Sequence, residues 1–197
     1  MAESRLKPAC RAVVIGGSAG SIEVLLKVLP ALPFGLSFAV IIVLHRKNSV
    51  DSSLAHLLSL KTAVPIQEVE DKQPVLPGSM YLAPADYHLL IEKEEVFSLD
   101  NSEKINYSRP SLDVTFESAA DVYGPAVVGV LLSGANADGT AGLNAIKKAG
   151  GTIVAQKPET ALSGFMPQHA ILHTPIDEVL DIDELMVFIN ALNVPKR

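Results

Sequence analysis

The segment Val13-Val14-Ile15-Gly16-Gly17-Ser18-Ala19-Gly20-Ser21 decides the fold of this chain. An apolar run ends in glycines that flank one serine, and an amphipathic stretch over residues 22–29 follows directly. This order predicts a buried strand, a tight turn and the start of a helix. Gly16, Ser18 and Gly20 fit G-x-S-x-G, which in a nucleophile elbow exposes the serine hydroxyl at the end of the strand. A phosphate- or dinucleotide-binding glycine turn fits equally well, and the segment alone does not separate the two.

Apolar strands alternate with helical patterns along the rest of the chain. Strands are predicted at 12–17, 37–44, 125–132, 152–155 and 176–180, and helices at 21–29, 50–59, 111–123, 138–149, 167–172 and 182–192. Near-continuous runs of Val, Ile and Leu are typical of parallel strands covered on both faces. Three short runs at 78–83, 87–92 and 96–99 indicate antiparallel hairpins instead. We therefore expect one α/β domain over residues 1–197, a three-layer α/β/α fold whose sheet is mostly parallel and doubly wound, with a small antiparallel hairpin element.

The composition of the chain argues against several classes of protein. The net charge of −6 and the scattered basic residues argue against nucleic-acid binding. No apolar run is long enough to cross a bilayer, and residues 1–8 have no signal-peptide core, so we expect no membrane insertion. One cysteine, Cys10, excludes an internal disulfide and suits a reducing compartment. These features predict a soluble, cytoplasmic protein.

Three polar residues follow predicted strands and are candidates for catalysis. Ser18 follows the first strand, His45 the second, and Asp138 comes after the glycine-bearing turn behind 125–132. Because parallel strands end at one edge of the sheet, these side chains form a possible nucleophile, base and orienting acid. Each also has a simpler interpretation: His45 as a solvated residue at a strand exit, and Asp138 as an ordinary helix N-cap.

Other site types find less support in the sequence. No histidine pair has compact ligand spacing with a carboxylate, so we predict no metal site. A dinucleotide site needs a second glycine where Ser18 stands and an acidic residue after the second strand, where His45-Arg46 is found. Arg46 would suit a phosphorylated ribose, so NADP binding stays open as an alternative.

At these residues the chain resembles the catalytic domain of the chemotaxis protein-glutamate methylesterases, the CheB family. The similar segments are Ile15-Gly16-Gly17-Ser18-Ala19-Gly20, Val43-Leu44-His45, residues 81–89 (YLAPADYHL), residues 108–120 (SRPSLDVTFESAA), residues 129–139 (GVLLSGANADG), Ala155-Gln156 and Gly164-Phe165-Met166-Pro167. Any one segment is weak evidence for the family, but the order and density of the segments over about residues 13–180 are specific to it.

The resemblance implies a serine hydrolase that removes methyl groups from glutamyl esters on the cytoplasmic helices of chemoreceptors, with possible deamidation of receptor glutamines. It implies Ser18 as nucleophile, His45 as base and Asp138 as orienting acid. The backbone amides of Ala19 and Ala135 would be the oxyanion donors, and no cofactor is implied.

The chain departs from the family in three respects. Ser21 replaces a glycine and is expected to N-cap the helix, and Ala135 stands where many relatives have methionine. Only about a dozen residues precede the first strand, so we expect no N-terminal receiver domain in this chain. These departures keep a second hypothesis open, a non-catalytic module that binds receptors or other proteins on the same fold.

Overall fold

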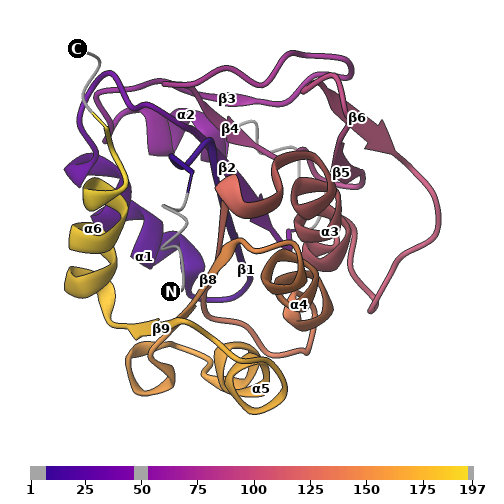
Figure 1. The fold of residues 1–197 in the computed structure, drawn as a ribbon, viewed down its shortest axis with the longest axis vertical. Coiled ribbons are helices and arrows are strands. Elements are labelled where there is room, and N and C mark those ends of the chain that lie inside the picture. Colours follow the sequence, from indigo (N-terminus) through magenta and orange to yellow (C-terminus); the bar gives the residue numbers. More distant parts are fainter. Residues whose placement is uncertain (1–7, 47–52, 195–197) are drawn as a thin grey trace, which may run out of the picture.

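A seven-stranded parallel sheet organises the described part of the chain, residues 8–46 and 53–194 of a computed structural model (Figure 1). Its strand order is β3-β4-β2-β1-β7-β8-β9, and each neighbouring pair is parallel. The strands are β1 (Ala12–Gly17), β2 (Ala39–Leu44), β3 (Ile66–Glu68), β4 (Met80–Leu82), β7 (Val127–Leu131), β8 (Thr152–Gln156) and β9 (Glu178–Leu180). A two-stranded antiparallel pair, β5 (His88–Ile91) with β6 (Phe97–Asp100), confirms the hairpin expected there.

Helices cover both faces of the sheet, which confirms the three-layer prediction (Figure 1). The helices are α1 (Ser21–Val28), α2 (Ser53–Ser59), α3 (Leu112–Tyr123), α4 (Thr140–Lys148), α5 (Phe165–His173) and α6 (Ile182–Ala191), with 3-10 turns at Leu29–Ala31, Gly124–Ala126 and Pro158–Thr160. Alternate residues of β1 face the two layers. Val13 packs in the cluster that holds α1, α2 and α6 residues, and Val14 packs in the cluster of α3, α4 and α5 residues. Burial on both faces explains why β1 has no polar residue.

The strand order reverses beside β1. From β1 the chain continues to β2 and to the edge strand β3, then to β4 between them, and it later returns to place β7 on the other side of β1. The carboxyl ends of β1, β2 and β7 therefore lie together, with Gly17 opposite Leu44 and Gly16 opposite Leu131. In open α/β sheets this switch point is where ligands bind, so the fold places residues 18, 45 and 132–139 at the expected position for a site.

The middle of the chain differs from the sequence prediction. The run predicted as a hairpin at 78–83 is β4, which lies inside the main sheet, parallel to β2 and β3. The strand β3 had not been predicted. Both strands are only three residues long, and a short apolar run between turns does not reveal its pairing partner. The helix predicted at 50–59 is described from Ser53 onward, and its predicted start lies outside the described residues.

Within the described residues, no helix combines the length and the apolar character that a bilayer crossing requires.

Helices α3 and α4 approach closely because α4 contains Gly142. A β-carbon on Gly142 would lie 2.5 Å from Phe116 Cβ and 2.9 Å from the Asp113 carbonyl oxygen. Both are rigid neighbours, so a side chain there would push the helices apart. This contact matters for the site, because residues at the start of α3 and just before α4 contribute to it.

Gly142→Ala is therefore expected to destabilise the protein, although alanine normally stabilises a helix interior by about 1 kcal/mol relative to glycine. We expect the free energy of unfolding, measured with urea, to fall by about 2 kcal/mol because of the overpacking. Asn144→Ala, at a half-buried position of the same helix, is the control and should leave stability unchanged or slightly raised. A Gly142→Ala protein as stable as the natural chain would refute the close-packing argument.

Candidate active site

Ser18 lies at the tip of the turn between β1 and α1. Its backbone N–H donates to the Ser133 carbonyl (2.8 Å), and the Ser21 hydroxyl donates to that same carbonyl (3.0 Å). Ser21 was expected to N-cap α1, and that expectation is wrong: Gly20 is the N-cap, with φ of 85°, and Ser21 is the first helical residue. The Ser21 hydroxyl instead fills the space above Gly17, where a β-carbon would lie 2.1 Å from its oxygen. The turn is thus fixed to the end of β7 by hydrogen bonds.

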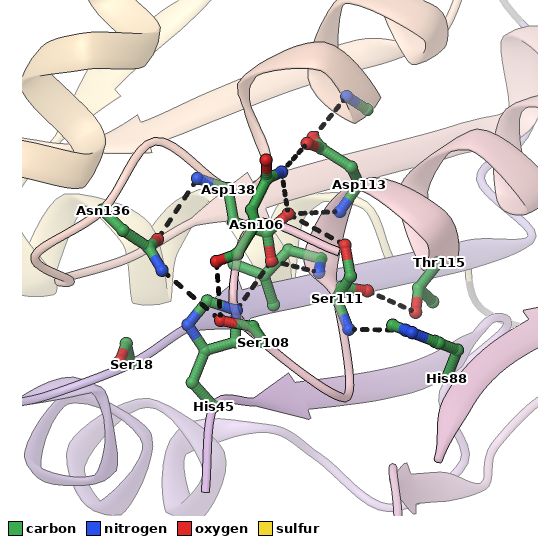
Figure 2. Close-up of polar contacts among 12 residues, drawn as sticks. Ser18, His45, His88, Asn106, Ser108, Ser111, Asp113, Thr115, Asn136 and Asp138 are labelled. Atoms are coloured by element: carbon green, nitrogen blue, oxygen red, sulfur yellow. Dashed lines mark hydrogen bonds and ion pairs between the residues drawn. The ribbon is translucent and has the colours of Figure 1, made fainter. Parts of the chain in front are cut away.

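His45 directly follows β2, next to Ser18. Its backbone N–H donates to the Gly17 carbonyl (3.0 Å), which continues the pairing of β1 with β2 by one residue. The ring Nε2 lies 2.7 Å from Asp138 Oδ2, and the side chain is 11% exposed. No hydrogen bond joins the Ser18 hydroxyl to the ring among the described residues. Figure 2 shows Ser18 beside the ring, on the side away from Asp138. The structure therefore joins the histidine to the aspartate and leaves the serine adjacent but unbonded to the ring.

Asp138 is fully buried and accepts hydrogen bonds through both carboxylate oxygens. Besides His45, its donors are the Leu112 N–H (2.7 Å), the Ser111 hydroxyl (2.9 Å), the Asp113 N–H (3.2 Å) and the Asn106 amide (3.3 Å). The simpler interpretation of Asp138, as the N-cap of its own helix, is wrong, because Gly139 with φ of 93° occupies that position. Asp138 instead satisfies free N–H groups at the start of α3, where a negative charge is favoured.

A second buried carboxylate, Asp113, lies beside Asp138 (Figure 2). Its Oδ1 accepts from the Gly142 N–H (2.8 Å) near the start of α4, and its Oδ2 accepts from the Asn106 amide (3.0 Å). Asp138, which precedes α4, therefore accepts from the start of α3, and Asp113, which lies in α3, accepts from the start of α4. Asn106, whose φ is 49°, donates to both carboxylates and bridges them.

The two carboxylates are perturbed in opposite directions. Burial raises the pKa of Asp113 from 3.8 to about 6, and the neighbouring Asp138 charge adds to that rise. Burial would also raise the pKa of Asp138, but the hydrogen bonds from His45 and the Leu112 N–H outweigh it and lower the pKa to about 2. Asp138 is thus the more acidic member of the pair and stays ionised well below neutral pH, as a partner for an imidazolium requires.

The two backbone amides expected to hold an oxyanion belong to Ala19 and Ala135. Ala19 follows Ser18 in the elbow, and Ala135 lies in the turn after β7. Within the described residues neither backbone N–H donates a hydrogen bond to the protein, and both residues are exposed. The Ser133 hydroxyl donates to the Ala19 carbonyl (2.6 Å), which fixes that peptide relative to β7. Both amides are therefore free to bind a ligand oxygen.

Sequence reasoning missed the residues that support Asp138. Ser111 is the N-cap residue of α3, but its hydroxyl donates to Asp138 instead of capping the helix. His88 is buried, and its Nδ1 accepts from the Ser111 N–H (3.1 Å). Asp113 lies in a segment singled out by the resemblance, but nothing in the sequence marks Asn106.

Other candidate groups are accounted for elsewhere in the fold. Arg46, which NADP binding would have used, is held by Glu68 (2.8 Å) and the Ala83 carbonyl (3.0 Å). Burial raises the pKa of the Cys10 thiol to about 12, which keeps it protonated and unreactive. In the part of the chain that the structure describes, no three His, Cys, Asp or Glu side chains are arranged to hold a metal ion.

Comparisons with known proteins give one consistent result. The family model described as CheB methylesterase matches residues 13–189. A Leptospira interrogans protein named putative protein-glutamate methylesterase/protein-glutamine glutaminase is 41% identical, covering 94% of this chain and 98% of its own. The Thermotoga maritima protein-glutamate methylesterase/protein-glutamine glutaminase is 36% identical, and the match spans 52% of its length. The crystal structure of the Thermotoga maritima CheB methylesterase catalytic domain superimposes with a TM-score of 0.89 at 34% identity, covering 94% of this chain and 100% of that one.

The buried carboxylate pair predicts a pH-dependent stability difference for Asp113→Asn. The pKa of Asp113 is higher in the folded protein than its ordinary value, so the folded state binds its proton more tightly. The stability that this group contributes is therefore full below about pH 4 and is lost as the pH rises through about 6. We measure the free energy of unfolding of Asp113→Asn and of the natural chain with urea. As the pH rises from about 4.5 to 7.5, we expect the difference between the two values to change by roughly 1–2 kcal/mol in favour of the variant. Asp121→Asn, which removes an exposed charge from the same helix, is the control. Parallel pH profiles for Asp113→Asn and the natural chain would contradict the argument.

Proposed function

The chain belongs to the CheB methylesterase family, and from this premise we propose that it is a serine hydrolase that demethylates glutamyl methyl esters. The observation that carries the proposal is the 2.7 Å contact between His45 Nε2 and the ionised Asp138, directly beside Ser18. A carboxylate only accepts hydrogen bonds, so Nε2 holds the ring proton and Nδ1 is left as the acceptor. That nitrogen is the base that a serine nucleophile needs.

The reaction proceeds by two acyl-transfer steps. The Ser18 hydroxyl attacks the γ-carbonyl of the methylated glutamate while His45 Nδ1 takes its proton. Asp138 stabilises the imidazolium that forms. The Ala19 and Ala135 amides donate to the oxyanion, which develops in a site at the start of α1. The imidazolium then returns its proton to the departing methanol, and a water activated by the same ring releases glutamate and free Ser18.

The absence of a hydrogen bond between Ser18 and His45 fits this mechanism. Catalytic hydrogen bonds are often long in an unliganded enzyme and shorten when substrate binds. The two residues are fixed by backbone pairing of adjacent strands, so rotation of the Ser18 side chain is the movement required.

The substrates proposed are methylated glutamates on the cytoplasmic helices of chemoreceptors. The names of the relatives specify methylated protein glutamates, and the chemoreceptor is part of our proposal. A glutamine side chain offers the same γ-carbonyl with an amide in place of the ester. Attack by Ser18 then releases ammonia, so glutaminase activity follows from the same machinery.

Ser18→Ala tests the proposal directly. We expect methanol release from methylated receptor to fall at least about a thousandfold, because no other hydroxyl replaces the nucleophile. Ser98→Ala, which removes a half-buried hydroxyl from β6, is the matched control and should keep full activity.

A fluorophosphonate probe separates the hydrolase from a non-catalytic binding module on the same fold. Stoichiometric labelling of the natural chain at Ser18 supports the hydrolase. A well-folded protein that is neither labelled nor active on methylated receptor would overturn the proposal in favour of the module.

A further inference from the structure

A cavity of about 320 Å³ opens beside His45. We call it the cation pocket, because its lining includes Arg46, Lys104 and Arg109, and Asp86 is its one acidic residue. The whole chain carries a net charge of −6. The three cations face Asp86 in the lining and Glu68, which pairs with Arg46. One positive charge is left in excess, opposite in sign to the protein as a whole, and such local charge recruits ligands of the opposite sign.

The two guanidinium groups are held in place with donors to spare. Arg46 Nη2 is fixed by Glu68 and the Ala83 carbonyl, and Arg109 Nη1 donates to the carbonyls of Asn101 (2.7 Å) and Ser102 (2.6 Å). The Nε atoms of both residues are buried without an acceptor in the described part of the chain. A buried donor without an acceptor costs free energy, so these fixed cations favour a ligand that supplies acceptor oxygens.

The outer part of the pocket is formed by the loop between β6 and α3. Lys104 is exposed and forms no ion pair among the described residues. Tyr107 also lines the pocket and is 98% exposed, with φ of 62°. This loop therefore presents an ammonium group and an aromatic ring to whatever approaches His45.

We propose that the cation pocket binds a carboxylate side chain of the substrate, one that neighbours the reacting ester. This inference rests on the proposed function for the position of the ester at Ser18. His45 borders both Ser18 and the pocket, so a substrate seated at one reaches the other. On a helix, residues three and four apart lie about 5–6 Å from each other, which places a glutamate there within reach of the pocket. The enzyme then selects methyl esters within acidic helical segments.

The test is a binding measurement in a Ser18→Ala background, so that it does not depend on turnover. The probes are two fluorescent peptides of about 15 residues, long enough for partial helix formation. Each has one γ-methyl glutamyl ester, flanked at positions three and four by glutamate in one peptide and by glutamine in the other. We expect the acidic peptide to bind about fivefold tighter at low salt, and this preference to shrink as salt is added.

Charge reversal assigns the preference to the pocket. Lys104→Glu should abolish the preference for the acidic peptide. Lys148→Glu makes the same charge change at an exposed position in the last turn of α4, at the other end of that helix from the site, and should preserve the preference.

Two results would overturn the inference: equal binding of the two peptides by Ser18→Ala, or equal loss of preference in both charge-reversal variants. Either result could accompany full methanol release by the natural chain, in which case the proposed function stands without the pocket. An acidic preference that depends on Lys104, found in a chain that hydrolyses no ester, would support the pocket and refute the hydrolase.

Discussion

The buried carboxylate of Asp138 is the group on which the site depends. It accepts five hydrogen bonds, from His45 and from groups at residues 106 and 111–113. Such a dense set of donors keeps the carboxylate ionised although it is fully buried. The same interactions cap α3 and fix one ring nitrogen of His45, so the start of a helix and the orientation of the base are set by one side chain.

The stability of the helical layer and the geometry of the site are coupled through this arrangement. Asp138 precedes α4 and caps α3, while Asp113 belongs to α3 and binds the backbone near the start of α4. Gly142 lets the two helices approach closely enough for both contacts. The like charges of the two carboxylates oppose each other, and the Asn106 amide between them offsets part of that cost. A network in which every acceptor is satisfied tolerates little movement, which suits a residue that must hold the base in one orientation.

Local sequence patterns were sufficient to predict the long helices and strands. They failed where strand pairing or side-chain orientation depends on residues far away in the chain. β1, β2 and α6 lie close to their predicted positions because their apolar periodicity spans six or more residues. The run at 78–83 was placed in a hairpin, and only the sheet topology assigns Met80–Leu82 to the parallel strand β4. Asp138 matched the pattern of a helix N-cap, but the N–H groups that it caps belong to a helix that starts 26 residues earlier in the chain.

The sequence by itself determined that Ser18, His45 and Asp138 follow strands of one parallel sheet, because strand periodicity and the turn glycines are local properties of the chain. It also identified the family, through the order and density of short motifs. Only the tertiary structure decided that Asp138 contacts His45, that Asp113 and Asn106 complete the network, and that three cations from two loops share one pocket. These are contacts between residues far apart in the chain, and their distances depend on how strands and helices pack rather than on any local pattern.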